Sequence, residues 1–127
     1  MRVFDSGATR DSEDGKLDFD GFLSPEALLM FAEYMHKHRI QPDGSMRDGG
    51  NWKKGIPLDA YRKSMWRHFF DVWYAMHYAG EAKASRIDLQ DSLCALLFNI
   101  QGILDTLARE KTAGEMDAEN DNGLSAV

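Results

Sequence analysis

The sequence has one cysteine, three prolines and no uninterrupted apolar run close to the length of a membrane span. One cysteine excludes an internal disulfide and any zinc site built from several cysteines. A membrane-spanning helix needs about 20 consecutive apolar residues, and Met1 to Asp5 lack the apolar core of a secretory signal. We therefore expect no membrane partner and a reduced, cytoplasmic setting.

The chain also lacks an excess of positive charge. Its 127 residues carry 15 Lys and Arg against 21 Asp and Glu, for a net charge of −6. Residues 112–127 hold four of the acids and no base, which leaves −2 on residues 1–111. Binding along a nucleic-acid backbone requires a strongly basic face, so we expect no nucleic-acid partner. A small anion held by a few local cations is still compatible with this charge.

The material for one core is present. Apolar residues make up 43% of the chain and include seven Phe, four Tyr and three Trp, in a length that suits a single domain. Ser24 followed by Pro25 is a favourable helix start. Apolar residues at helical spacing predict helices at about 25–38, 58–78 and 87–109. Three amphipathic helices predict an all-α fold, a small helical bundle.

The two ends of the chain differ from this helical middle. Residues 1–23 have no clean period, which predicts an irregular N-terminal segment. Residues 112–127 are polar and acidic, which predicts a disordered tail after a single domain at 1–111. The apolar face of the third helix is broader than one partner stripe requires. We therefore expect a homo-oligomer, a dimer or tetramer, built on that helix.

A long polar loop at 40–56 joins the first two predicted helices. Compact domains seldom keep so long a connection without a function. Trp52 could stack on a nucleobase there, with Asn51 for hydrogen bonding and Lys53 for charge. A second role fits the sequence equally well: Trp52 could anchor the loop by packing into the core.

Polar residues form a stripe on each of the two longer predicted helices. His68 and Asp71 lie one turn apart on one helix, as do Asp88 and Asp91 on the next, where Asn99 extends the stripe. If the helices pack antiparallel, the stripes could meet and offer oxygen ligands for Mg²⁺ or Mn²⁺. Charges at helical spacing more often form a solvated face, with Asp88 only capping a helix. Both alternatives stay open on spacing alone.

Two cations could meet a phosphate. Arg67, next to His68, could bind phosphate in bidentate fashion, or it could be a surface charge. Lys16 follows a stretch rich in glycine, whose backbone can cradle phosphate. This stretch lacks the Walker pattern, so its signal is weak on its own.

Five short motifs occur in the same order as in phage dATP/dGTP diphosphohydrolases, which resemble the MazG-like, all-α nucleotide pyrophosphohydrolases. They are GATRD at 7–11, GK at 15–16, SPEAL at 24–28, NWKKG at 51–55 and RH at 67–68. The resemblance covers nearly everything from about residue 4 to residue 107. It implies a helical nucleotide-binding fold, usually oligomeric, which cleaves a purine deoxynucleoside triphosphate to the monophosphate and pyrophosphate.

The resemblance also implies a divalent metal, Mg²⁺ or Mn²⁺, held by acidic residues one turn apart on two successive helices. The matching positions here are His68, Asp71, Asp88 and Asp91. Asp91 is the same residue as in the family pattern. Asp71 and Asp88 stand where the pattern has the longer carboxylate Glu, and His68 stands where it has a carboxylate. In this hypothesis His68 is a ligand or the base that activates water, and His68 and Asp91 are the catalytic residues.

The leading hypothesis is therefore a metal-dependent nucleotide pyrophosphohydrolase, in the host cytoplasm if a phage encodes it. The residues expected to contact its substrate are Lys16, Asn51, Trp52, Lys53, Arg67 and Asn99. The alternative is a nucleotide-binding protein without turnover, which sequesters a nucleotide such as a host defence signal. A third hypothesis is a structural or regulatory phage protein that uses the bundle only to oligomerise.

Overall fold

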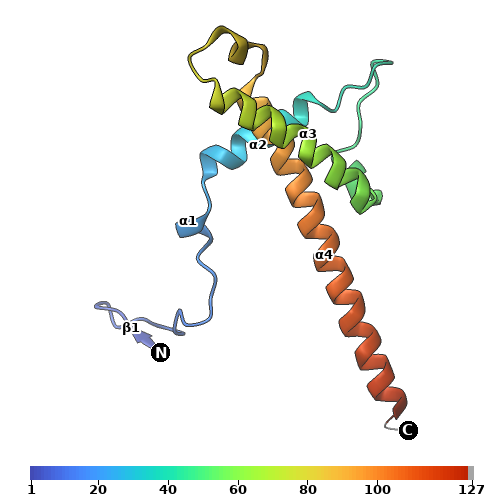
Figure 1. Cartoon of the computed structure of the whole chain (residues 1–127). Helices are drawn as coiled ribbons and strands as arrows, with labels where there is room; N and C mark the ends of the chain where they lie inside the picture. The colour runs from blue at the N-terminus through green and yellow to red at the C-terminus, as the bar shows by residue number, and fades with distance from the viewer. Residues whose placement is uncertain (126–127) are drawn as a thin grey trace.

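The computed structural model describes residues 1–125, and most of them are helical (Figure 1). The helices are α1 (Phe19–Phe22), α2 (Pro25–Lys37), α3 (Leu58–His77) and α4 (Leu89–Ser125), with 3-10 turns η1 (Asn51–Lys54) and η2 (Ala82–Arg86) between them. The predicted mostly helical fold with three main helices is confirmed. No helix within residues 1–125 combines the length and the apolar character needed to cross a bilayer.

α2 begins where the sequence predicted. The Ser24 hydroxyl accepts a hydrogen bond of 3.1 Å from the backbone N–H of Ala27, which satisfies one of the free donors at the helix start. Pro25 occupies the first turn, where its missing N–H costs nothing. The helix ends at Lys37, one residue before the predicted boundary.

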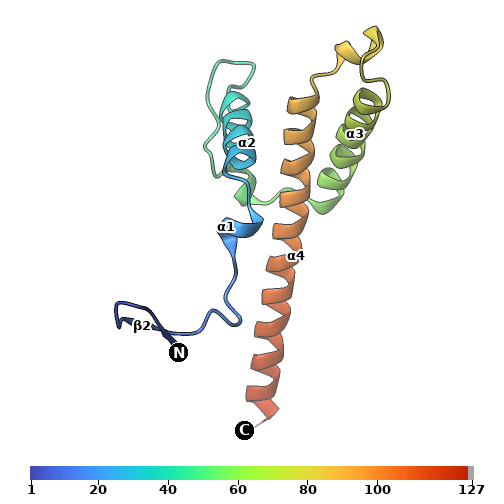
Figure 2. The same cartoon turned by 90° about the vertical axis from the view of Figure 1, so that its left-hand side faces the viewer.

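α3 and α4 run in opposite directions and make the most extensive contact in the fold (Figure 2). Gly80, with φ of +87°, ends the turn after α3 in a backbone conformation that favours glycine. Tyr61 of α3 is buried and lies against Gly102 of α4. The antiparallel packing assumed for the polar stripes is therefore present.

α2 packs on α4 through a smaller contact, so α4 lies between α2 and α3 (Figure 2). The core that results is thin. Among residues 1–119 the buried apolar side chains are Tyr61, Val72, Ala75, Cys94 and Ala95, and no large side chain there is completely buried. Burial of Cys94 raises the pKa of its thiol, so a reactive thiolate is disfavoured at this position.

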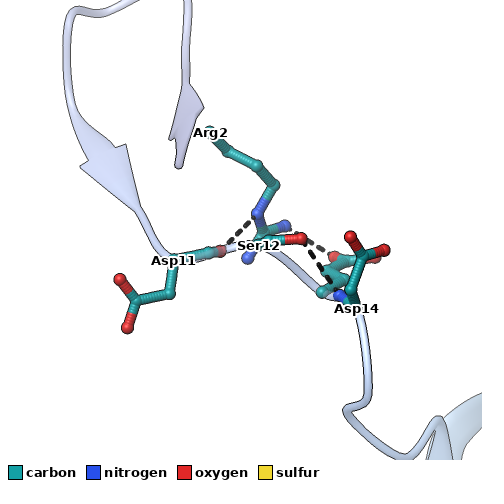
Figure 3. A network of polar contacts seen from close by, with 5 residues as sticks. Arg2, Asp11, Ser12 and Asp14 are labelled. Atoms are coloured by element: carbon teal, nitrogen blue, oxygen red, sulfur yellow. Dashed lines mark hydrogen bonds and ion pairs between the residues drawn. The ribbon is translucent and has the colours of Figure 1, made fainter.

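The N-terminal segment forms an arm that extends away from the helices (Figure 1). Strands β1 (Arg2–Val3) and β2 (Thr9–Arg10) pair antiparallel, with Arg2 opposite Arg10 and Val3 opposite Thr9. The Arg2 side chain donates 2.9 Å to the Asp11 carbonyl and pairs at 2.6 Å with Glu13 (Figure 3). These contacts join residues within the arm and do not connect it to the helices.

α4 extends further than the sequence predicted. The expected end at about Arg109 is wrong for this structure, because the helix continues to Ser125 and includes most of the predicted disordered tail. Residues 110–119 contain Glu, Lys, Ala and Met, which favour helix, and no proline. Their side chains are all exposed. The tail's last two residues, 126–127, lie outside the described residues.

Candidate functional site

A cavity of about 250 Å³ lies where the end of α2, the 39–56 loop and α4 meet. Four rings line it: Tyr34 from α2, His38 just after the end of α2, Trp52 from η1, and Phe98 from α4. The Tyr34 and His38 rings have their centroids 4.3 Å apart. The cavity thus offers flat apolar surfaces of the kind that suit a planar ligand.

Two arginines line the same cavity, and the loop backbone holds them together. The N–H of Arg47 donates 2.8 Å to the carbonyl of Arg39, and Nε of Arg39 donates 2.7 Å to the carbonyl of Arg47. Ile40 and Met46 form a β-bridge inside this pair, and Gly44 makes the tight turn with φ of +86°. The predicted long polar loop therefore contains a small hairpin at 39–47, which brings two cations together.

The cavity has a surplus of positive charge. Asp48 is the one carboxylate among its described lining residues. Within the part of the chain that the structure describes, neither Arg39 nor Arg47 forms an ion pair. Two guanidinium groups are thus available to an anion, and each can bind phosphate through two parallel hydrogen bonds.

Trp52 lies between this cavity and a second one of about 200 Å³, whose walls include Tyr61 and Arg109. Its ring is half-buried. Arg109 donates a long hydrogen bond of 3.4 Å to the carbonyl of Lys53, and the Lys53 ammonium lies 5.8 Å from the Trp52 ring centroid. Trp52 therefore contributes to packing against α4 and still presents surface to the arginine-lined cavity, so both predicted roles are compatible with its position.

Tyr34 connects the cavity to the start of α4. Burial raises the pKa of its hydroxyl, and the negative charge of Asp91 raises it further, against an opposing effect of Lys37. Asp91 itself accepts a hydrogen bond of 2.8 Å from Lys37 of α2, and that bond raises the pKa of the Lys37 ammonium. A carboxylate therefore lies near the cavity wall, with its charge matched by a lysine.

The four predicted metal ligands do not form a metal-binding group within one chain. Asp88 accepts a 3.0 Å hydrogen bond from the N–H of Asp91, so the capping alternative holds for Asp88. Asp91 pairs with Lys37, while His68 and Asp71 are half-buried on α3. Nowhere in the described residues do three or more His, Cys, Asp or Glu side chains gather as a metal site. A single chain thus does not fit the expected Mg²⁺ or Mn²⁺.

The predicted substrate residues divide into two groups. Asn51 and Trp52 line the cavity, and Lys53 lies beside the Trp52 ring. Lys16, in contrast, lies on the N-terminal arm, and Arg67 is exposed on α3. Asn99 is buried, and its amide donates 2.8 Å to the Ala95 carbonyl. That bond gives Asn99 a structural role inside α4 rather than a place at the cavity.

Sequence reasoning missed Tyr34, His38, Arg39 and Arg47 as cavity residues. The available signal was Pro42 and Gly44, which mark a turn with an arginine at similar distance on either side. The function is inferred below from this cavity and from the motifs around it, because comparisons with protein-family models, curated proteins and solved structures give no match to this chain.

Proposed function

We propose that this protein binds a purine nucleotide in the cavity between α2, the 39–56 loop and α4. One observation supports the proposal most. An accessible tryptophan face lines the same cavity as two arginines that have no ion-pair partner in the part of the chain that the structure describes. A nucleobase can stack on Trp52 while Asn51 hydrogen-bonds its edge. Arg39 and Arg47 then bind the phosphates.

The size and charge of the cavity favour a nucleotide over a nucleoside. A volume of about 250 Å³ is slightly below the roughly 300–1,000 Å³ of typical small-molecule sites, so the cavity suits a base with its sugar and leaves the phosphates at the arginine-lined edge. Because cations outnumber carboxylates on the wall, each added phosphate should strengthen binding. The sequestering hypothesis requires only such nucleotide binding, without hydrolysis.

Metal-dependent hydrolysis of a purine deoxynucleoside triphosphate to the monophosphate and pyrophosphate is the second candidate function. It is supported by the position of Asp91, whose charge acts on the cavity residue Tyr34. The carboxylates do not gather as a metal site within one chain, so binding is the function that the geometry supports better. Both candidate functions imply a cytoplasmic setting, because free nucleotides, their ligands or substrates, are found there.

Calorimetry with dATP, dGTP, the matching monophosphates and adenosine tests the proposal. We expect affinity to rise with phosphate number, and Trp52→Ala to weaken binding by about 1–3 kcal/mol. Arg62→Gln, an arginine on the surface of α3, is the matched control for Arg47→Gln. Equal binding by wild type and Trp52→Ala would refute the site. Pyrophosphate release with Mg²⁺ or Mn²⁺ would select the hydrolase.

The accompanying proposal on assembly is a homo-oligomer built on α4, as the sequence predicted. Its exposed apolar residues alternate in steps of four and three: Leu93, Leu97, Ile100, Leu104 and Leu107. This α4 seam has the spacing of a coiled-coil contact. One chain exposes 10,233 Å², whereas a compact protein of this mass exposes about 6,800 Å². The extended N-terminal arm and the exposed residues 110–119 contribute to this excess.

A further inference from the structure

α3 is apolar on two sides. Tyr61, Val72 and Ala75 are buried on the side toward α4. At about 100° per residue, a second set of apolar residues is centred about 120° away around the helix, and we name it the aromatic stripe. It consists of Trp66, Phe69, Phe70, Trp73 and Met76. Most of the steps between them are of three or four residues, so they form one broad band along the helix.

The aromatic stripe is largely exposed in the part of the chain that the structure describes. The exposed fractions are 61% for Trp66, 56% for Trp73 and 60% for Met76. The extensive contacts of α3 within the described chain are with α4 and η2. Helices that are apolar on all sides are normally buried, and contiguous exposed apolar patches mark interaction sites. Trp, Phe and Met are also the residue types enriched in protein interfaces.

The two ends of the stripe have complementary shapes. A groove of about 280 Å³ lies at its C-terminal end, lined by Phe70, Trp73, Tyr74, His77 and Tyr78. Trp66 is at the N-terminal end, with its ring edge-on to Phe69 at 5.9 Å. A protruding indole and a groove lined by rings are the two halves of a typical interface hot spot.

We propose that a second copy of this chain covers the aromatic stripe. The two α3 helices pack antiparallel about a two-fold axis between Phe70 and Trp73, so that Trp66 of each copy enters the groove of the other. A self-complementary surface that carries both halves of the contact fits a two-fold interface. It also makes another copy of this chain the natural occupant.

The positions of the two apolar surfaces point to more than one interface. On α4 the seam lies opposite Gly102, which faces α3, whereas the stripe is centred about 120° around α3 from the residues that face α4. One partner cannot cover both surfaces. Two different two-fold interfaces generate a tetramer with dihedral symmetry.

Sedimentation of the full chain tests the stripe independently of nucleotide binding. We expect wild type at four times the 14.4 kDa of one chain. Trp73→Glu and Ile100→Glu should each halve that mass, and the double variant should be monomeric. Ala60→Glu, at an exposed α3 position outside the stripe, should leave the mass unchanged. If Trp73→Glu folds by circular dichroism and keeps the wild-type mass, the proposal is overturned.

Crosslinking decides the case in which Trp73→Glu fails to fold. Cys94 is the chain's one cysteine, so Cys94→Ser provides a thiol-free background. In that background, a mixture of the Phe70→Cys and Trp73→Cys variants should form a disulfide between copies on mild oxidation. Ala60→Cys mixed with Trp73→Cys is the control and should not. Absence of the 70–73 crosslink at the concentration where wild type is tetrameric would refute the antiparallel contact.

Discussion

The ring of Tyr61 on α3 lies directly against the backbone of Gly102 on α4. Tyr61 also meets the ring of Phe98 edge-on, with centroids 5.9 Å apart. Both Tyr61 and Gly102 are buried. A methyl group at residue 102 would overlap the Tyr61 ring, so the closeness of the two helices depends on the missing side chain.

Gly102→Ala should therefore destabilise the fold even though alanine is the better helix former. The gain in helix propensity is about 1 kcal/mol, and overpacking of a filled contact typically costs about 1–3 kcal/mol. We expect a lower free energy of unfolding in urea. Gly114→Ala is the matched control, because a side chain there meets open space, and it should not lower the free energy of unfolding. Equal effects of the two changes would contradict the Tyr61 contact.

Replacing the arginines of the cavity should weaken nucleotide binding, whereas replacing Arg67 on α3 should not. Arg39→Gln and Arg47→Gln should each weaken triphosphate binding more than monophosphate binding, because each removes a bidentate phosphate contact. Arg67→Gln should leave both affinities unchanged, since Arg67 is exposed outside the cavity. Calorimetry at two salt concentrations checks this. A loss in Arg67→Gln equal to that in Arg47→Gln would place the phosphates on α3, as the sequence first suggested.

Asp91→Asn separates the two candidate functions. If the protein is a metal-dependent hydrolase, removal of this carboxylate should abolish most pyrophosphate release. If it only binds nucleotide, affinity should change little or rise, because one negative charge near the cavity is gone. The fold should survive, since the Lys37 partner lies at the surface and exposed ion pairs contribute little. Full turnover in Asp91→Asn would show that this residue is not catalytic.

Tyr34 should make the fold less stable in alkali. Its pKa is raised in the folded chain, first by burial and then by Asp91, so the folded state holds this proton to higher pH than the unfolded state does. The stabilisation is complete below the unfolded pKa of about 10 and is lost as pH rises through the folded pKa. Tyr34→Phe should remove this part of the pH dependence of unfolding. Tyrosinate absorbance of wild type minus Tyr34→Phe reports the titration directly, and Asp91→Asn should lower its midpoint.

Deletion of residues 113–127 should change the melting temperature very little. The side chains of residues 113–119 are exposed, and the α4 seam ends at Leu107, so these described side chains add no contact to the core or to the proposed assembly. Differential scanning calorimetry and sedimentation of the truncated chain check both points. A fall in melting temperature of more than about 5 °C corresponds to roughly 1 kcal/mol for a domain of this size. Such a fall would show that the tail makes stabilising contacts.

The sequence predicted the elements whose signals are local. Ser24 and Pro25 start α2 because capping depends on a few adjacent groups, and Gly80 lies just beyond α3 for the same kind of reason. The end of α4 was mispredicted because polar residues after Arg109 can form a helix without any packing partner. Polarity alone therefore does not distinguish a solvated helix from an irregular tail.

The candidate site was only half predictable. Trp52 and Asn51 stood out because of residue type and loop length, and they do line the cavity. Arg39 and Arg47 come together through backbone pairing across a turn, which has no period to detect. The polar stripes do lie on two antiparallel helices, but Asp91 forms an ion pair with Lys37 from a third helix, α2. Spacing along two helices cannot reveal such a competitor.

The thin core of the single chain has a consequence for protein abundance. No large side chain among residues 1–119 is completely buried. If the α4 seam and the aromatic stripe are covered by other copies as proposed, the folded population should depend on protein concentration by mass action. At low expression most chains would be exposed to cellular proteases, whereas at high expression they would protect one another. The steady-state level should therefore increase more steeply than the rate of synthesis.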